Sequence, residues 1–553
     1  MPLAIAALVA LAAPFVTQST TLASTASDGT LPDDEARLPA LSADGKVVAF
    51  DGKASNLVEN DLNGTHDVFR RVLATGSTDL VSVSLTGAPG NGKSVDACLS
   101  GDGRYVAFES AADDLVAGDT NAARDVFVRD LWQGVTERVS VSGAGLQGDG
   151  ASRGATISAD GRFVAFSSTS TNLVAGDTNG VEDVFVHDRR TRATWRASVS
   201  SLGAQGSRAG YEPALSADGT HLAFIDLSPE LATGAQDGAA NLFVADLGTG
   251  AVVLVEPSIG GQQLPVGWTR PSLSADGRQL VVEAYGGGVY VHDLQSDLSV
   301  RADLNDQGVP ADMGGFWPSM TADGRQVAFM TYSTNMGAPG QQDRVYVRDL
   351  DAATTQMVSL ATSGAAPNAL SNLPSISADG RLVAFASLAT NLIPNGVPGN
   401  YWKVFVRDRA GCTPTVATYC TSSATSLGCV AAIAATGTPS LSAPQAFEVA
   451  SGTVPGDSLG VACVGVAGPA ALPLGSQGGL LCLGAFARSA ALFAGGSPGA
   501  CDGELRLSLA DLVAAEPALA EPSGMAWVQF WFRDSGGANG FGLSNALWFT
   551  TCP

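Results

Sequence analysis

The chain has 553 residues, of which 53 are Asp or Glu and 30 are Lys or Arg, so its formal net charge at pH 7 is −23. This acidic, lysine-poor composition lacks the basic surface that nucleic acids and anionic membranes attract, and it argues against both as partners. The length exceeds that of one ordinary domain, so we expect more than one.

The first predicted segment is a signal peptide over residues 1–26. Residues 2–16 form an apolar run that is too short to span a membrane as a helix, and Ser24, Thr25 and Ala26 provide a small-residue cleavage site. No Lys or Arg precedes the run, which departs from the usual pattern. No other stretch is apolar and long enough to cross a membrane. The sequence therefore predicts an exported protein without a membrane span.

A repeat occupies the chain from about residue 35. Its signature is Ser/Thr-x-Asp-Gly, and the steps in sequence number between successive copies of the Asp are 58, 58, 58, 58, 47 and 56. A nearly fixed period of this length indicates a repeat architecture. The seven copies of this Asp are Asp44, Asp102, Asp160, Asp218, Asp276, Asp323 and Asp379.

Each repeat contains four short predicted strands. Asp-Gly between apolar runs predicts a hairpin with a two-residue turn. The strand after it, such as residues 105–108, is apolar on both faces and should be covered on both sides. A third strand follows at residues 183–188 and a fourth at residues 136–142 in their respective repeats. Four antiparallel strands in each of seven repeats predict an all-β, seven-bladed propeller over residues 35–422.

The length variation between repeats lies in the loop between the second and third strands. The step from Phe166 to Val184 is 18, whereas the corresponding step from Val282 to Val289 in the fifth repeat is 7. This difference of 11 accounts for the repeat step of 47 instead of 58. The loop is therefore the variable part of a constant scaffold.

The repeated words Ser-Ala-Asp-Gly-Arg-x-Val-Ala-Phe and Asp-Val-Phe-Val-Arg-Asp resemble the TolB-type β-propeller repeats of secreted and periplasmic bacterial proteins. The resemblance covers about residues 35–422, with Ala where that family usually has Pro before Asp-Gly. It implies the propeller fold and a location outside the cytoplasm, either secreted or in the periplasm or cell envelope of a bacterium. It implies no single activity, because the family includes transport accessories, peptidase-gating domains and lyases.

Residues 423–553 have a different composition, with less charge and more Gly, Ala and Ser. Short apolar runs between Gly/Pro turns predict a small β-sandwich-like domain. The clustered cysteines indicate an oxidising compartment and disulfides, with Cys420–Cys429 and Cys482–Cys501 as the preferred pairs. Zinc is the alternative, although no His follows His292 and no Cys-x-x-Cys pair occurs. The tail cysteines are Cys412, Cys420, Cys429, Cys463, Cys482, Cys501 and Cys552.

This tail also resembles a C-terminal module of assorted exported bacterial proteins. The resemblance rests on residues 419–429, 529–534 and 543–547 and on the final Cys552. It implies no catalytic residue.

The variable loops of the first three repeats are candidate calcium sites. They carry oxygen-bearing side chains at alternate positions, a Gly for a sharp turn and a later carboxylate, as calcium loops do. The alternative is that these Asp/Asn/Gly turns form through side-chain hydrogen bonds to the backbone, without metal. The candidate ligands are Glu59, Asp61, Asn63 and Asp67, then Asp119, Asn121 and Asp125, and then Asp177, Asn179 and Asp183.

For function, the sequence favours binding over catalysis. The loops between the second and third strands and the Gly-rich connections between repeats leave the same face of the propeller, so we expect a protein or glycan ligand to bind there. The alternative is a hydrolase or lyase with a metal in the central channel. Against it, His187 and His292 occupy a repeat position that elsewhere holds Arg, which indicates a solvated strand site.

Overall fold

The structure is a computed structural model of the chain. It describes residues 18–409, except 260–261, 265–269, 338–339 and 395, and beyond Ala410 it describes the strands and one helix given below. The chain divides into two compact units, Gln18–Ala410 and a second that contains Met1–Thr17 and Gly411–Pro553.

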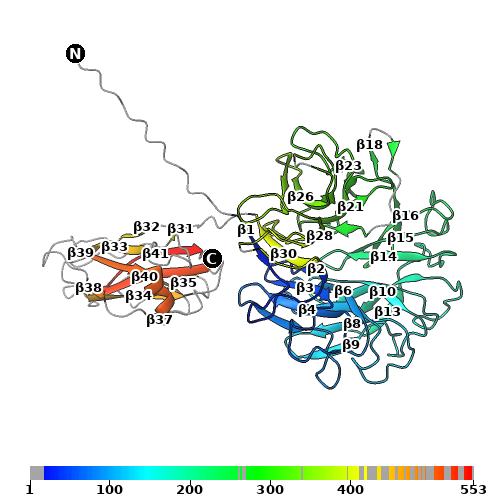
Figure 1. The fold of residues 1–553 in the computed structure, drawn as a ribbon, viewed down its shortest axis with the longest axis horizontal. Coiled ribbons are helices and arrows are strands. Elements are labelled where there is room, and N and C mark those ends of the chain that lie inside the picture. The colour runs from blue at the N-terminus through cyan, green and yellow to red at the C-terminus, as the bar shows by residue number, and fades with distance from the viewer. Residues whose placement is uncertain are drawn as a thin grey trace, which may run out of the picture. The chain divides into compact units, whose positions relative to one another are not determined.

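The unit Gln18–Ala410 consists of seven four-stranded antiparallel sheets arranged as the blades of a propeller, which confirms the predicted fold. In Figure 1 the inner strands β2, β6, β10 and β14 lie toward its middle, and the outer strands β9 and β23 lie toward its rim. From inner to outer strand, the first blade contains β2 (Ala36–Leu41), β3 (Val47–Gly52), β4 (Asp67–Val72) and β5 (Ser77–Leu80). The second blade contains β6 (Ser94–Leu99), β7 (Tyr105–Ser110), β8 (Asp125–Asp130) and β9 (Val135–Arg138). The third blade contains β10 (Ser152–Ile157), β11 (Phe163–Ser168), β12 (Asp183–Asp188) and β13 (Ala193–Arg196). The fourth blade contains β14 (Gly210–Leu215), β15 (His221–Asp226), β16 (Asn241–Asp246) and β17 (Val252–Val255). The fifth blade contains β20 (Ser272–Leu273), β21 (Gln279–Glu283), β22 (Val289–Asp293) and β23 (Leu298–Arg301). The sixth blade contains β24 (Phe316–Met320), β25 (Gln326–Thr331), β26 (Arg344–Asp349) and β27 (Thr354–Met357).

The seventh blade is completed by the N-terminal part of the chain. Its inner strands are β28 (Ser371–Ile376), β29 (Leu382–Ser387) and β30 (Lys403–Asp408), and its outer strand is β1 (Ser19–Leu22), which pairs antiparallel with β30. The propeller unit therefore begins and ends earlier than the predicted range of 35–422. Cleavage after Ala26, at the predicted signal-peptide boundary, would remove β1. The leader itself stays a prediction.

The core of the propeller lies between adjacent blades. All six residues of β3, a second strand, are buried, as expected for a strand that is apolar on both faces, and all six residues of the third strand β12 are buried as well. Within a blade, Phe166 stands opposite Phe185 with ring centroids 6.0 Å apart. Phe166 also belongs to one packed cluster with Val128 of the preceding blade. Burial of each such side chain stabilises the fold by about 1.5–3 kcal/mol, so neighbouring blades stabilise each other.

The Ser-x-Asp-Gly signature forms the turn between the first and second strands. In the third repeat the amide of Gly161 donates to the carbonyl of Ser158 (2.9 Å), and Gly161 has a φ of +70°. The hydroxyl of Ser158 donates to the carboxylate of Asp160 (2.6 Å), which also accepts from the amide of Arg162 (2.9 Å). The expected two-residue turn is therefore wrong. A four-residue turn with only its Gly at positive φ takes its place, and the repeated Asp has a structural role.

The fifth repeat shows how the variable loop shortens. β21 and β22 are joined by residues 284–288, in which Gly286, Gly287 and Gly288 have φ of +89°, +95° and +126°. Side chains other than Gly rarely adopt these conformations, so the three glycines permit the tight connection. A further small hairpin, β18 (Ser258–Ile259) and β19 (Gln262–Gln263), precedes this blade.

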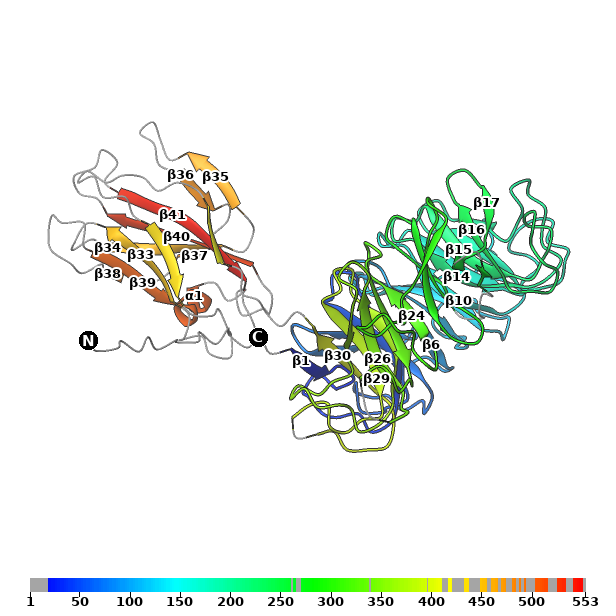
Figure 2. The same cartoon turned by 90° about the horizontal axis from the view of Figure 1, so that it is seen from above.

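The C-terminal unit is also made mostly of β-strands. Its sheet contains β31 (Val416–Tyr419), β41 (Phe541–Thr550), β40 (Met525–Arg533), β34 (Leu459–Gly465) and β37 (Ala487–Arg488) in that order, with β38 (Leu492–Phe493) paired to β34. Figure 2 shows β40 beside β41. A second sheet contains β32 (Ala432–Thr436), β33 (Glu448–Val454) and β39 (Gly503–Ser508), and β35 (Pro469–Pro473) pairs with β36 (Leu480–Leu483).

The helix α1 (Leu509–Ala515) follows β39 directly. The hydroxyl of Ser508 accepts from the amide of Asp511 (3.2 Å), and the amide of Ser508 donates to the Asp511 carboxylate (3.0 Å), which is a capping box. No helix in the part of the chain that the structure describes has the length and hydropathy to cross a membrane.

The predicted disulfides are not tested by this structure. Cys420, Cys429 and Cys501 lie outside the described residues, and Cys482 lies in β36 without a described side chain. The two disulfide pairs therefore stay predictions.

Candidate ligand-binding channel

One position in each repeat points into the centre of the propeller. It lies six residues before the repeated Asp, and in every blade except the fifth it stands at a β-bulge in the inner strand. At six of the seven copies the backbone has positive φ, from +48° at Leu38 to +65° at Gly154. This conformation costs roughly 1–2 kcal/mol for a residue with a side chain. Bulges of this kind redirect a side chain out of the regular strand pattern, here toward the propeller axis. The seven residues, which we call the axial ring, are Leu38, Asp96, Gly154, Glu212, Arg270, Trp317 and Leu373.

The axial ring lines a single cavity of about 620 Å³. Residues from all seven blades contribute to its wall, so the cavity is the central channel of the propeller. The residue after each ring position is always Pro or Ala, whereas the ring position itself holds acidic, basic, aromatic, aliphatic and Gly residues. The repeats thus differ in chemistry at the ring position.

The charged side of the channel is organised by Arg270. Its guanidinium donates to both carboxylate oxygens of Asp96, with 2.6 Å between Nη1 and Oδ1, and its Nε donates to Glu212 (3.0 Å). Asp96 belongs to the second blade and Arg270 to the connection before the fifth, so this contact joins non-adjacent blades. The Arg270 side chain is 45% exposed, which leaves part of it accessible from the channel.

Two further ion pairs extend this charged side. Arg124 donates to Glu109 (2.8 Å), and Arg153 forms a bidentate pair with Glu182 (2.7 Å for both contacts). Burial, and then the nearby charge of Asp96, raises the pKa of Glu109 to about 7. Glu109 therefore titrates near neutral pH.

The opposite side of the channel is apolar. Leu38, Trp317 and Leu373 come from the first, sixth and seventh blades, and Trp317 is 43% exposed. The amide of Trp317 donates to the Glu283 carboxylate (3.1 Å), which fixes the backbone of this residue. The channel thus offers an exposed aromatic surface opposite a cluster of charged groups.

The axial ring and the charged groups beside it lie toward the loop-rich face of the propeller. Each inner strand starts at the connection between repeats and ends at the Ser-x-Asp-Gly turn, and the ring positions lie in its first half, except Arg270, which precedes β20. Glu109 lies next to the end of β7, and Arg124 immediately precedes β8, so both flank the variable loop of the second blade. The charged groups therefore stand at the end of the channel where we expected ligand binding.

The Asn residues of the predicted calcium loops act as structural clamps. The side-chain amide of Asn121 donates to the carboxylate of Asp125 (3.0 Å) and to the carbonyl of Gly148 (2.9 Å). Asn63 makes the same two contacts in the first repeat, and Asn179 makes them in the third. In all three loops the Asn therefore presents its N–H group, rather than its oxygen, to the following carboxylate.

In the second and third repeats an Arg already lies between the predicted acidic ligands. Arg138 stands 3.2 Å from Asp119 and 3.6 Å from Asp125. Arg196 stands 3.3 Å from Asp177 and 2.9 Å from Asp183. In the first repeat Asp61 and Asp67 are buried, Glu59 is exposed, and calcium binding stays a prediction there. No group of three or more His, Cys, Asp or Glu side chains that would hold a metal occurs among the described residues.

The repeat position that holds Arg or His is not solvated, which corrects the sequence-based expectation. His187 and His292 are 4% and 2% exposed. The Nδ1 atom of His187 lies 2.8 Å from the hydroxyl of Thr194, and Arg129 donates to Thr136 in the same way (3.0 Å). Arg and His are interchangeable here because either can hydrogen-bond to the hydroxyl on the outer strand.

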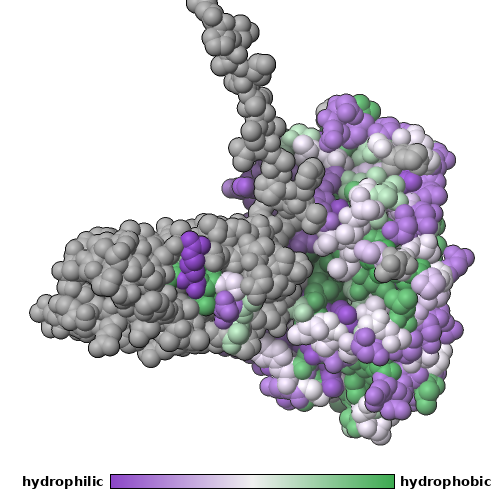
Figure 3. All heavy atoms as spheres, turned by 60° about the vertical axis from the view of Figure 1, so that its left-hand side comes forward, coloured by the Kyte–Doolittle hydropathy of each residue, from purple (hydrophilic) through white to green (hydrophobic). Residues whose placement is uncertain are grey.

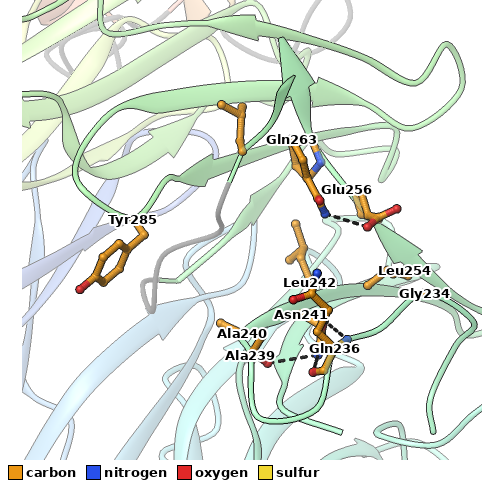
Figure 4. Close-up of a pocket in the computed structure, with 13 residues that line it drawn as sticks. Gly234, Gln236, Ala239, Ala240, Asn241, Leu242, Leu254, Glu256, Gln263 and Tyr285 are labelled. Carbon is orange, nitrogen blue, oxygen red and sulfur yellow. Dashed lines mark hydrogen bonds between the residues drawn. The ribbon is translucent and has the colours of Figure 1, made fainter. Parts of the chain in front are cut away.

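A smaller cavity of about 330 Å³ lies beside the short loop of the fifth blade (Figure 4). Tyr285 stands on that loop, while Asn241 and Gln236 stand on the fourth blade. The amide of Asn241 exchanges two hydrogen bonds of 2.8 Å with the backbone of Gln236, and Gln263 donates to Glu256 (2.7 Å). These polar groups bond to one another, so this cavity is a weaker candidate than the channel.

The axial ring was not predicted from the sequence, although a signal was present. A Pro follows the ring position in five of the seven repeats, whereas the informative column is the ring position itself. When repeats are aligned, a column that changes chemistry between otherwise repeated neighbours marks a surface with a role specific to this chain. The positive φ that directs this column inward is not readable from the residue types.

The buried carboxyl groups predict an unusual pH dependence. Burial raises the pKa of Asp67 to about 6 and those of Glu109 and Asp226 to about 7. Because these values exceed those of the unfolded chain, the folded protein binds more protons between about pH 4 and 7. Stability should therefore increase as the pH falls from 7 toward 4, by an amount on the order of 3 kcal/mol per group. Melting temperatures at pH 4.5, 5.5 and 7 test this, and Asp226→Asn should flatten the slope. A melting temperature that rises steadily with pH would contradict it.

No family model matches the chain, and no curated protein matches it. Solved propeller structures do. The chain is 17% identical to TolB from Acinetobacter baumannii, with 52% of this chain and 58% of TolB covered and a TM-score of 0.33, so it spans little more than half of TolB. It is 14% identical to an oligogalacturonate lyase from Vibrio parahaemolyticus, with 71% of this chain and 97% of the lyase covered and a TM-score of 0.44. It is 12% identical to the propeller domain of the Trilobed protease from Pyrococcus furiosus, with 69% of this chain and 95% of that domain covered and a TM-score of 0.43. At these values none of the likenesses bears on function.

Proposed function

We propose that this chain is an exported binding protein whose propeller takes its ligand at the loop-rich end of the central channel. The observation that carries the proposal is the axial ring: seven equivalent positions converge on one cavity and bring charged, aromatic and aliphatic residues together there. The strained backbone at these positions is retained although it costs stability, as is typical of functional sites.

The chemistry of the channel favours a ligand with one flat or apolar side and one polar side. Trp317 offers an exposed ring for stacking, and Arg270 and Glu212 offer a donor and an acceptor on the other side. Sugars and aromatic or proline-containing peptides both have this character. The ligand is therefore a glycan or a segment of a protein, in line with the sequence-based expectation.

On the coloured part of the side shown in Figure 3, hydrophilic and hydrophobic residues are intermixed. The exposed Trp132 lies on the opposite face of the propeller, where Arg104 of the neighbouring turn stacks on its ring at 4.6 Å. Trp132 thus offers a matched control for Trp317.

The test is a screen of the purified protein against a glycan array and a library of bacterial envelope peptides. Ligands found should be lost in Trp317→Ala and retained in Trp132→Ala, because only the first residue lies in the channel. Retention in Trp317→Ala and loss in Trp132→Ala would place binding on the other face and refute the proposal.

An enzymatic role is the second candidate, and the titration of Glu109 near pH 7 favours it, since a general base works best near the operating pH. Turnover of a polysaccharide that is abolished by Glu109→Gln, with binding retained, would establish it. Binding without turnover would establish the first proposal.

A further inference from the structure

The end of the channel opposite the loop-rich face is surrounded by a ring of backbone hydrogen bonds between the Ser/Thr-x-Asp-Gly turns of neighbouring blades. An amide of each turn donates to a carbonyl of the next turn, and the seventh turn donates to the first, so the ring has no break. The bonds run from Asp44 to Gly101 (3.3 Å), from Gly101 to Ala159 (2.9 Å), from Ala159 to Ala217 (2.8 Å), from Asp218 to Ala275 (3.0 Å), from Ala275 to Ala322 (2.8 Å), from Ala322 to Ala378 (3.1 Å) and from Ala378 to Ala43 (3.0 Å).

Small residues let these turns approach one another closely. The residue before the repeated Asp is Ala in six repeats and Gly101 in the second. A Cβ on Gly101 would lie 3.0 Å from the Cβ of Ala159, closer than carbon atoms normally pack, so the two turns are in contact. Seven such groups in a circle, with neighbours about 3.5–4 Å apart, leave an opening of about 4–5 Å. An extended chain with its side chains occupies about 10 Å between stacked sheets and does not pass through such an opening.

The channel is therefore blind at this end. The axial ring lies in the wall of its cavity, whereas none of the residues that form the seven Ser/Thr-x-Asp-Gly turns, all of them described in the structure, belongs to that wall. A polymer can enter the cavity only from the loop-rich face and cannot thread through the propeller. The ligand that suits a blind channel is a chain end.

Three guanidinium groups offer unused donors to this cavity. Arg124, Arg153 and Arg270 line it, and their side chains are 42%, 59% and 45% exposed. A guanidinium has five N–H donors, of which Arg124 uses one for Glu109 and Arg153 uses two for Glu182 among the described residues. These two carboxylates are only 5% and 12% exposed. The acidic groups thus lie behind the guanidinium groups, and this side of the wall mainly offers donors to a ligand.

A carboxylate matches these donors, because it pairs with a guanidinium through two parallel hydrogen bonds. The other side of the wall, with Leu38, Trp317 and Leu373, is apolar. The last residue of a polypeptide combines both properties, since its carboxylate and its side chain are attached to the same carbon atom. It is also a chain end.

We propose that the channel binds the C-terminal end of a partner polypeptide, with the terminal carboxylate on the guanidinium side and an apolar last side chain against Trp317. The inference names the ligand of the channel and therefore rests on the proposed function.

An acidic glycan shares the carboxylate but fits the wall less well. Its hydroxyl groups need acceptors, whereas Asp96 and Glu109 are buried and already accept from Arg270 and Arg124. The aliphatic side chains of the apolar side offer no hydrogen bond to a hydroxyl group. The wall therefore favours a polypeptide end over a sugar acid.

Binding of a carboxylate should be coupled to the uptake of a proton. Glu109 faces Asp96, the guanidinium of Arg124 and the amide of Gly154 (2.6 Å), and burial, followed by the charge of Asp96, raises its pKa to about 7. A further negative charge nearby favours the protonated form of Glu109. Affinity should therefore increase as the pH falls from 8 to 6, while a terminal carboxylate, with a pKa of about 3.5, stays ionised. The charged groups that face one another at the channel are Asp96, Glu109, Glu182 and Glu212 with Arg124, Arg153 and Arg270.

The experiment measures binding of the full chain to N-acetylated peptides that share the stem Gly-Ser-Gly-Ser-Gly and differ in the last residue, which covers all amino acids. Each peptide is used with a free C-terminal carboxylate, as its amide, and with Gly-Ser-Gly-Ser added after the varied residue. We expect the tightest binding for free carboxylates with an aromatic or aliphatic last residue. The amide should bind at least about tenfold more weakly, because it loses the charge-assisted hydrogen bonds. The extended form should bind as weakly, because its apolar residue is no longer next to the carboxylate.

Three variants locate the ligand in the channel. Arg270→Ala should reduce the preference for the free carboxylate over the amide, and Arg124→Gln provides the same measurement if the first variant does not fold. Trp317→Ala should remove the preference for an apolar last residue. Trp132→Ala, on the opposite face, is the control and should bind like the natural chain.

Each other result decides against a defined part of the proposal. Equal binding of the free, amidated and extended forms that depends on Trp317 would mean that the channel takes an internal segment, which overturns the inference and leaves the proposed function standing. Trp317-dependent binding of a glucuronic acid oligomer, without binding of any peptide, would overturn it in favour of a glycan. Equal affinity at pH 6 and pH 8 would show that the carboxylate does not bind beside Glu109. Peptide binding that Trp317→Ala leaves unchanged would refute the inference and the proposed function together.

Discussion

A chain that starts at Ser27 is expected to be far less stable than one that starts at Gln18. The shorter chain lacks β1, and with it the hydrogen bonds between β1 and β30, from Ser19 opposite Asp408 to Leu22 opposite Phe405. At about 0.5–1.5 kcal/mol for each net hydrogen bond, this ladder alone contributes several kcal/mol. β30 would also become an exposed edge strand, which is prone to pairing with other chains.

Side-chain contacts add to this loss. The hydroxyl of Thr20 donates to the carbonyl of Leu360 (2.6 Å) and accepts from Arg407 (3.0 Å). Ser24 accepts from the amide of Val404 (3.0 Å) and is fully buried. Removing these groups leaves the buried Arg407 and Val404 with unmet donors, each at a cost of about 1–3 kcal/mol.

The measurement is urea unfolding of full-length protein and of chains that start at Gln18 and Ser27. The Gln18 chain should match the full-length protein, and the Ser27 chain should lose at least about 4 kcal/mol and aggregate at low denaturant. Equal stability of the two truncated chains would mean that β1 does not close the ring. If the chain is exported as proposed, N-terminal sequencing of the mature protein should find a cleavage point before Gln18.

The strand β1 illustrates the limit of sequence-based prediction in this chain. The repeat predicts strands because local words recur, as in residues 163–166, and the structure has seven such blades. β1 carries no copy of any repeat word, and its partner β30 lies at the opposite end of the propeller unit. Ring closure by the two ends of the unit is a long-range pairing, so no local pattern marks it. The predicted end of the seventh blade therefore falls in residues that belong to the C-terminal unit.

The candidate site was predictable in location but not in composition. The loop-rich face followed from where the length variation lies, and the charged groups of the channel stand near it. Arg270 and Asp96 are ordinary polar residues in the sequence, and only the bulged backbone of Asp96, with a φ of +59°, brings it toward Arg270. In the loops, the acidic pattern around Asp125 was visible, whereas the Arg138 that compensates it lies at the end of the outer strand β9.

Replacing Arg270 by Ala should destabilise the propeller by about 1–3 kcal/mol at pH 8, because the partly buried carboxylates around this half-exposed guanidinium lose their compensating charge. Asp96 and Glu212 both lose their guanidinium contact. Glu109 lies in the same cluster and already has a raised pKa. The ring positions would then hold the carboxylates of Asp96 and Glu212 and no cation.

The loss of stability in Arg270→Ala should become smaller as the pH falls. This direction of the pH dependence distinguishes an electrostatic contribution of Arg270 from a packing contribution. Burial raises the pKa of Glu212, and Arg270 counteracts that rise, so the variant should have a still higher value. A folded-state pKa above the unfolded one means that stability is gained as protons bind below that pKa. The variant should therefore recover much of its stability between pH 8 and pH 5. Arg153→Ala is the control, because Arg153 is 59% exposed and its pair with Glu182 should contribute less than about 1 kcal/mol. A deficit for Arg270→Ala that is the same at pH 5 and pH 8 would show that Arg270 acts through its packing and not through its charge.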